Sequence, residues 1–149
     1  MSDSCLIDTN ILVYAYDPSS AKKHSTALQV LDALAGTDAA VLSTQVLSEF
    51  YSVATRKLKP ALTASEAEER LHRLSRTWPV VPVTPLIVLE AARGARTFKL
   101  SFWDALIWAT ARLNQVPVVL SEDFSDGQSL DGVFFRNPFS AKFDIARLR

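Results

Sequence analysis

Short apolar runs alternate along the chain with longer segments in which apolar positions recur every three or four residues. Almost continuous apolar runs predict strands that are covered on both faces of a sheet. The predicted strands are Cys5 to Ile7, Ala40 to Leu42, Val80 to Val83, Val116 to Leu120 and Val133 to Phe135. Pro82 favours an edge position for the third of these, because proline cannot donate to a neighbouring strand. The rest of the tail after Ser121 is expected to be loop.

The segments with helical spacing are bounded by capping residues. The predicted helices are Asn10 to Tyr16, Ala21 to Leu34, a helix from Ser43 or Thr44 to about Leu58, Thr63 to about Trp78, Pro85 to about Gly94 and Ser101 to about Asn114. Thr63 with Glu66 forms a capping box, and Thr84 before Pro85 is a typical helix start. Strands that alternate with helices predict an α/β sandwich around a mainly parallel sheet.

Composition supports a globular protein with its own core. The chain has 149 residues, of which 48% are hydrophobic and 21% are charged, which excludes disordered and coiled-coil classes. A length near that of one typical domain predicts a single domain over residues 1–149. The single Cys5 cannot form an internal disulfide, and no apolar run is long enough to span a membrane. We therefore expect a cytoplasmic protein with no membrane association.

Charge is balanced in total but unevenly distributed. The chain has 16 Lys and Arg and 16 Asp and Glu, so the net charge does not indicate a nucleic-acid binder. Basic residues nevertheless dominate Tyr51 to Leu100, whereas acidic residues dominate Met1 to Phe50. The basic part predicts either a surface that binds a polyanion or ordinary solvated helix faces.

Several common chemistries are excluded by missing motifs. The four glycines form neither a GxGxxG turn nor a phosphate-binding loop. His24 and His72 are far apart in sequence and have no cysteines at zinc-binding spacing. Cys5 lies within an apolar run, where a small core residue is expected rather than a nucleophile.

Four carboxylates stand at positions that favour a shared site. Asp8 follows the first strand and Asp123 follows the Val116 to Leu120 strand, and ligands bind beyond the carboxyl ends of parallel strands. Glu49 and Asp104 lie on helices beside apolar stripes, at positions that we expect to be in the first turns. Each has an ordinary alternative: Asp8 and Asp104 can cap helices, Glu49 can be solvated, and Asp123 can belong to a polar loop.

A cluster of these four acids would need a cation. Two carboxylates about 4 Å apart repel each other by roughly 4 kcal/mol at an effective dielectric constant of 20. Oxygen ligands without His or Cys are the set that Mg²⁺ or Mn²⁺ prefers. Such ions activate water and stabilise phosphoryl charge in nucleases and phosphatases.

The order of these motifs resembles the PIN-domain ribonucleases, and in particular the VapC-type toxins of bacterial toxin–antitoxin pairs. The resemblance rests on four segments that together span most of the chain. They are Asp8-Thr9-Asn10, Leu47-Ser48-Glu49-Phe50, Phe102-Trp103-Asp104-Ala105 and Ser121-Glu122-Asp123, followed by Arg136-Asn137-Pro138-Phe139. It implies a PIN-like three-layer sandwich and an endoribonuclease that uses Mg²⁺ or Mn²⁺ on structured RNA such as tRNA or rRNA. It also implies a homodimer that is silenced by a small antitoxin.

The resemblance also assigns roles to residues. Asp8, Glu49, Asp104 and Asp123 would be the catalytic, metal-binding acids, with Asn10 orienting Asp8 or a water and Ser121 supporting the last acid. The fourth role stays open between Glu122, Asp123 and Asp126, although the family pattern favours Asp123. The basic residues expected near RNA are Arg56, Lys57, Lys59, Arg93, Arg96 and Lys99.

Two other functions fit the residues. One is a metal-dependent phosphatase of another α/β family, although position 10, where a phosphoaspartate enzyme commonly has a second Asp, is Asn10. The other is a catalytically silent module on the same fold that binds RNA or protein. The presence of all four acids counts against the silent module.

Overall fold

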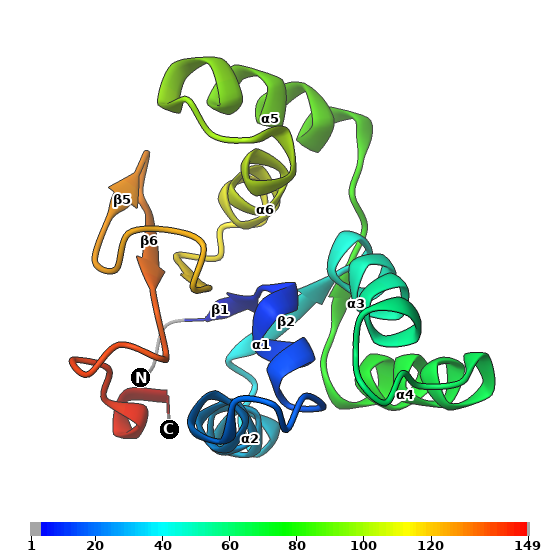
Figure 1. The fold of residues 1–149 in the computed structure, drawn as a ribbon. Coiled ribbons are helices and arrows are strands. Elements are labelled where there is room, and N and C mark those ends of the chain that lie inside the picture. The colour runs from blue at the N-terminus through cyan, green and yellow to red at the C-terminus, as the bar shows by residue number, and fades with distance from the viewer. Residues whose placement is uncertain (1–3, 149) are drawn as a thin grey trace.

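A six-stranded sheet forms the middle of the molecule (Figure 1). The computed structural model describes residues 4–148. The strands are β1 (Cys5–Ile7), β2 (Ala40–Ser43), β3 (Val80–Val81), β4 (Val118–Leu120), β5 (Ser129–Leu130) and β6 (Val133–Arg136), in the order β3-β2-β1-β4-β6-β5. All neighbours pair in parallel except β5, which is antiparallel to β6. The predicted α/β architecture with a mainly parallel sheet is confirmed, and β3 lies at an edge as Pro82 indicated.

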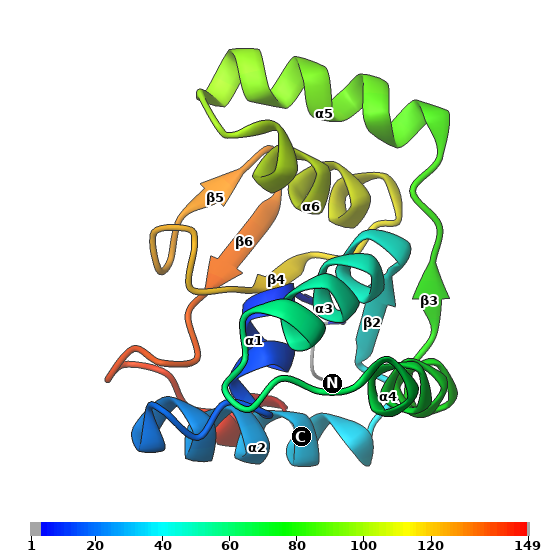
Figure 2. The same cartoon turned by 45° about the vertical axis from the view of Figure 1, so that its right-hand side comes forward.

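Helices cover both sides of this sheet (Figures 1 and 2). They are α1 (Thr9–Tyr14), α2 (Ala21–Ala35), α3 (Thr44–Arg56), α4 (Ala64–Thr77), α5 (Pro85–Phe98), α6 (Phe102–Leu113) and the 3₁₀ helix η1 (Ile145–Leu148). In both views α5 and α6 lie on one side of the strands, and α1 and α2 lie on the other. Across residues 4–148, no helix combines the length and the apolar character needed to cross a bilayer.

Capping residues set most of the helix boundaries. The Thr63 hydroxyl accepts from the Glu66 N–H, and the Glu66 carboxylate accepts from the Thr63 N–H, which is the predicted capping box of α4. The Thr84 hydroxyl accepts from the Ile87 N–H at 3.3 Å and so caps α5, without a reciprocal bond. The predicted end of α5 near Gly94 is wrong, because the helix continues to Phe98 and ends where Lys99 adopts a left-handed φ of 56°. A glycine in a helix weakens it without ending it when packing holds the next turn.

The tail contains more regular structure than the sequence predicted. Ser129–Leu130 pairs with Val133–Arg136 as a hairpin, and η1 follows near the end of the chain. Asp131 and Gly132 connect the two strands with φ values of 46° and 84°. Positive φ at both positions of a two-residue turn is typical of a hairpin, and an Asp-Gly pair favours it. The prediction of a loop over Ser129–Leu130 is therefore wrong, and the Asp131-Gly132 pair is the sequence feature that indicates the hairpin.

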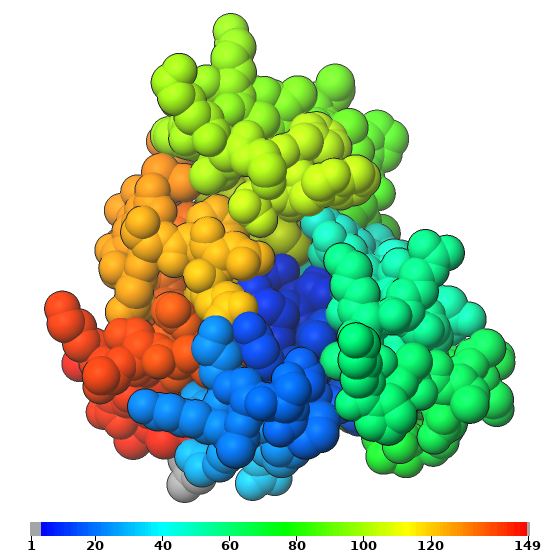
Figure 3. All heavy atoms as spheres, in the orientation of Figure 1, coloured from blue at the N-terminus to red at the C-terminus, as the bar shows by residue number. Residues whose placement is uncertain are grey.

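The sheet order brings distant segments to one edge. β1 lies directly beside β4, with Ile7 opposite Leu120, so Asp8 and Ser121 leave the sheet as neighbours. β2 lies on the other side of β1 and leads into α3. In Figure 3 the dark blue atoms, which belong to the beginning of the described part of the chain, lie between the cyan, lime and yellow segments. The fold therefore gathers β1, α3, α6 and the segment after β4 around one region.

Candidate active site

Asp8 occupies the centre of this region and is almost fully buried, with 4% of its surface exposed. One carboxylate oxygen accepts from the Thr9 N–H at 2.7 Å and so caps α1. The other accepts from the Ser121 hydroxyl at 2.7 Å. The capping role weighed for Asp8 is therefore real, and it coexists with a position at the predicted site.

Ser121 and Asn10 connect the first acid to the last one. The buried Ser121 oxygen donates to Asp8 and accepts from the Asp123 N–H at 3.0 Å. The Asn10 amide donates to Ser121 Oγ at 3.2 Å and to Asp123 Oδ2 at 3.1 Å. Asn10 thus contacts Asp123 directly and reaches Asp8 through Ser121.

Glu49 enters the site from α3. Its Oε1 accepts from the Thr9 hydroxyl at 2.7 Å, which links α3 to the first residue of α1. We expected Glu49 in the first turn of its helix, but α3 begins at Thr44 and places Glu49 in the second turn.

Asp104 lies in the first turn of α6 and is partly exposed. The Ser101 hydroxyl accepts from the Asp104 N–H at 3.2 Å and caps the helix. The cap therefore holds the backbone of Asp104, and the Asp104 carboxylate lines a pocket.

Four carboxylates line this pocket, whose volume is about 210 Å³. The lining residues are Asp8, Thr9, Gln45, Glu49, Ser52, Val53, Trp103, Asp104, Ile107 and Asp123. All four predicted acids therefore lie at the same pocket.

Burial and mutual repulsion raise the pKa of two of the acids. Burial raises the pKa of Asp8 to about 7, against the hydrogen bonds from Ser121 and Thr9, and the charges of Asp123 and Glu49 raise it further. Burial also raises the pKa of Asp104, and Asp123 and Glu49 add to that shift. The four carboxylates therefore share one electrostatic environment, in which adding negative charge is costly.

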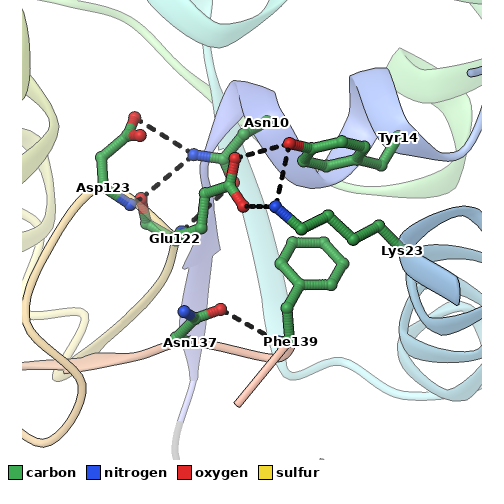
Figure 4. Close-up of polar contacts among 8 residues, drawn as sticks. Asn10, Tyr14, Lys23, Glu122, Asp123, Asn137 and Phe139 are labelled. Carbon is green, nitrogen blue, oxygen red and sulfur yellow. Dashed lines mark hydrogen bonds and ion pairs between the residues drawn. The ribbon is translucent and has the colours of Figure 1, made fainter. Parts of the chain in front are cut away.

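Glu122 and Asp126, the other candidates for the fourth acid, are engaged elsewhere. Glu122 accepts from the Tyr14 hydroxyl at 2.8 Å and pairs with Lys23 at 2.8 Å, whereas Asp123 faces Asn10 (Figure 4). Asp126 accepts from the Asn137 N–H at 2.9 Å. Neither Glu122 nor Asp126 is among the residues that line the four-acid pocket.

The acids fit a hydrated divalent ion better than a dehydrated one. In residues 4–148, no group of three or more His, Cys, Asp or Glu side chains forms a ready-made cage for a metal. Mg²⁺ keeps several of its waters and is commonly held by one or two carboxylates, so it needs no closed cage. Gln45 also lines the pocket, and its Oε1 is covered by other atoms of the protein and has no hydrogen-bond partner among the described residues. A pocket of oxygen donors with repelling carboxylates fits Mg²⁺ or Mn²⁺.

The predicted basic residues take different positions. Lys57 lines a second pocket, of about 330 Å³, together with Asn10 and Tyr14. This second pocket shares Thr9, Val53 and Asp123 with the four-acid pocket, so the two are adjacent.

Arg93 is used within the fold, since it pairs with Glu90 at 2.6 Å and with Asp131 at 3.1 Å. Four others are exposed side chains on α3, on α5 or just after them: Arg56, Lys59, Arg96 and Lys99. Of the six basic residues expected near RNA, Lys57 is therefore the one that lines a pocket beside the acids.

Sequence reasoning missed two residues that shape this region, Lys23 and Gln45. Lys23 lies 99 positions from its partner Glu122, and its ammonium group also stands 4.9 Å from the centre of the Tyr14 ring. Gln45 lies one turn before Glu49, and its amide donates to the Trp103 carbonyl at 3.0 Å. No local motif marks contacts between such distant positions.

Comparison with known proteins identifies the family. The PIN domain family matches residues 5–125, a range that includes all four acids. The chain belongs to the PIN-domain family. No curated protein sequence matches it significantly.

Solved structures share the fold at low sequence identity. A toxin–antitoxin complex from Klebsiella pneumoniae has 22% identity and a TM-score of 0.67, with 91% of this chain and 98% of that chain covered. VapC20 from Mycobacterium tuberculosis, described as a toxin that cleaves the sarcin-ricin loop, has 21% identity, a TM-score of 0.62 and coverages of 78% and 87%. VapBC2 from Rickettsia felis, bound to promoter DNA, has 14% identity, a TM-score of 0.64 and coverages of 89% and 97%.

Proposed function

We propose that the protein is a metal-dependent endoribonuclease that acts as the toxin of a toxin–antitoxin pair. The observation that carries this proposal is the pocket lined by Asp8, Glu49, Asp104 and Asp123, which reach it from four separate segments. Membership of the PIN family and the likeness to toxin structures support the same function.

Some residues of the site bind the metal or the RNA, and others hold the acids in position. The four acids hold Mg²⁺ or Mn²⁺, which supplies an activated water and neutralises charge on the phosphodiester. Ser121 and Asn10 fix Asp8 and Asp123 relative to each other through their hydrogen bonds. Lys57, beside the adjoining pocket, attracts the phosphate backbone of the RNA.

The proposed partners are an RNA such as tRNA or rRNA, a cognate antitoxin and a second copy of this chain. The similar structure from Klebsiella pneumoniae is a toxin–antitoxin complex, which supports an antitoxin for this chain. Leu86 and Leu89 on α5 are 70% and 67% exposed, which supports a homodimer that covers them. Residues 1–149 then act as one PIN domain in the cytoplasm, where the RNA is.

A cleavage assay tests the proposal. Purified protein is mixed with total RNA, with and without Mg²⁺, and Asp8→Asn and Asp32→Asn are compared with the wild type. We expect Mg²⁺-dependent fragments from the wild type and from Asp32→Asn, which changes a carboxylate on α2, and none from Asp8→Asn. Cleavage that continued in excess chelator, or in Asp8→Asn, would refute the proposal. Hydrolysis of phosphate monoesters without RNA cleavage would favour the phosphatase.

Growth assays separate the toxin role from the nuclease role. Expression of the wild type alone is expected to arrest growth, and expression of Asp8→Asn is not. Harmless expression of a protein that cleaves RNA in vitro would refute the toxin role and leave the nuclease role standing.

A further inference from the structure

A separate surface pocket is formed by β6 and the tail of the chain. This tail pocket has a volume of about 260 Å³ and shares no lining residue with the four-acid pocket. Three basic residues line it: Arg136 at the end of β6, and Lys142 and Arg147 in the tail. Phe134 also lines it and is 49% exposed. The tail pocket therefore combines positive charge with an accessible aromatic ring.

The strand β6 directs Phe134 and Arg136 to the tail pocket together. Side chains alternate along a strand, so these two residues, two positions apart, point to the same side of the sheet. Phe135 between them is buried, and its ring stacks on Phe124 with the ring centres 3.9 Å apart. The ring of Phe134 is left at the surface, on the same side of the sheet as Arg136.

The three cations of the tail pocket are not used in ion pairs within the fold. Across residues 4–148, none of Arg136, Lys142 and Arg147 pairs with a carboxylate. Asp126 and Asp144 also line the pocket, and each accepts a hydrogen bond from a backbone N–H, at 2.9 and 3.0 Å. Three positive and two negative side chains leave the lining with a net positive charge, which attracts an anion.

One loop borders both pockets. The segment after β4 places Asp123 at the four-acid pocket, and it places Asp126 and Gly127 at the tail pocket. Three residues of extended chain span at most about 11 Å, so Asp123 and Asp126 are close together. One short stretch of a polymer can therefore contact both pockets.

We propose that the tail pocket binds an unpaired nucleotide of the RNA on which the four acids act. This inference rests on the proposed function for the identity of the polymer. The basic side chains bind the phosphate, and the ring of Phe134 stacks on the base. The nucleotide must be unpaired, because a base inside a duplex does not offer its face to an aromatic side chain. An acidic polypeptide is the alternative ligand, and it offers charge without a flat base.

The experiment measures binding of a labelled single-stranded RNA of about 12 nucleotides by fluorescence anisotropy. It uses the full chain in excess chelator, so that metal-dependent cleavage does not occur. We expect Phe134→Leu, which removes the ring and keeps an apolar side chain, to weaken binding about tenfold, as loss of a stacked base does. The salt dependence of binding should stay that of the wild type, since this substitution changes no charge.

Lys142→Gln tests the phosphate contact. Loss of one contact with single-stranded RNA should lower the slope of log affinity against log salt by about 0.7. Arg76→Gln is the matched control, because it also removes one positive charge and Arg76 is exposed on α4, outside the tail pocket. We expect the control to keep the affinity and the slope of the wild type.

Each outcome decides the proposal. Wild-type affinity in Phe134→Leu overturns it, as does a salt slope in Lys142→Gln equal to that in Arg76→Gln. Polyglutamate that displaces the labelled RNA as well as unlabelled RNA does also overturns it, because the site would then respond to charge alone. If circular dichroism shows Phe134→Leu unfolded, the comparison of Lys142→Gln with Arg76→Gln and the polyglutamate competition decide.

Failure of this inference differs from failure of the proposed function. A wild type that cleaves RNA, alongside a Phe134→Leu variant that binds and cleaves it equally well, refutes the tail pocket alone. A wild type that cleaves no RNA with Mg²⁺, but binds it in a manner that depends on Phe134 and Lys142, refutes the nuclease and leaves the nucleotide pocket standing.

Discussion

Asp8 carries an electrostatic cost that the rest of the site must offset. Its pKa in the folded protein is about 7, above the ordinary value of 3.8 in the unfolded chain. The folded state therefore binds more protons between these two values, and the free energy of unfolding falls as pH rises through that window. A bound cation would remove this cost, because it favours the ionised form.

Asp8→Asn tests this cost directly. Asparagine can still cap α1 and contact Ser121, but it carries no charge. Without divalent ions at pH 8, we expect the variant to melt roughly 3 °C above the wild type, the shift that about 1 kcal/mol produces in a domain of this size. The gap should narrow at pH 5, where the folded wild type is protonated.

The control for this measurement is to repeat the melting experiment with Mn²⁺ added to both proteins. Mn²⁺ should raise the melting temperature of the wild type and not that of Asp8→Asn, because a ligand stabilises only the state that binds it. A variant that melted well below the wild type at both pH values would mean that Asp8 serves mainly as a cap.

The second residue-scale prediction concerns the fourth acid. Asp123 faces Asn10 at the pocket, whereas Glu122 is held by Lys23 and Tyr14 (Figure 4). Asp123→Asn should therefore reduce Mn²⁺ affinity and RNA cleavage at least tenfold, the effect expected for a residue that orders a metal site. Glu122→Gln and Asp126→Asn should keep both within about threefold, a difference below 1 kcal/mol. Full activity in Asp123→Asn with loss in either other variant would make the assignment wrong.

The order of residues indicated the acids and two neighbours in sequence that contact them, Asn10 and Ser121, but not the contacts made by distant residues. Asp8 and Asp123 follow strands, and that position is visible in the order of residues alone. The pairing of Gln45 with Trp103 spans 58 positions and depends on the packing of α3 against the start of α6. The choice between Glu122 and Asp123 likewise depended on Lys23, which no local pattern connects to them.

At the scale of elements, the packing of α5 on α6 sets a strict size limit at Gly94. A Cβ atom added to Gly94 would collide with the ring of Trp108, which is fully buried. In an open helix Gly→Ala stabilises by about 1 kcal/mol, but overpacking a core costs about 1–3 kcal/mol. We expect the collision to dominate, so that Gly94→Ala lowers the melting temperature.

A double-mutant cycle checks that cause. In a Trp108→Leu background, which removes the ring, Gly94→Ala should lose most of its cost or become stabilising. An unchanged cost in that background would show that the collision with Trp108 is not the reason.

Helix starts were predictable because each depends on residues within one turn. Thr63, Thr84 and Ser101 all cap the helices that follow them, as their local patterns indicated. Helix ends and the tail were less predictable, because packing decides them. Gly94 did not end α5, since its place against Trp108 is a close approach that only glycine allows.

At the scale of the whole molecule, apolar surface remains uncovered on the side away from α1 and α2. On α5, Leu86 and Leu89 are 70% and 67% exposed, and on α6 Trp103 is 63% exposed. Leu86 and Leu89 are three positions apart and so lie on one face of α5. Large apolar side chains in such a group indicate a protein interface, and a second copy of the chain is the partner that we propose for it.

Light scattering at micromolar concentration tests this assembly. We expect a dimer for the wild type and a monomer for Leu89→Glu, because a buried charge without a partner opposes association strongly. Leu28→Glu is the matched control, since Leu28 is exposed on α2 at 47%, on the other side of the sheet. A monomeric wild type would refute the homodimer, and a dimer that persisted in Leu89→Glu but dissociated in Leu28→Glu would move the interface to α2.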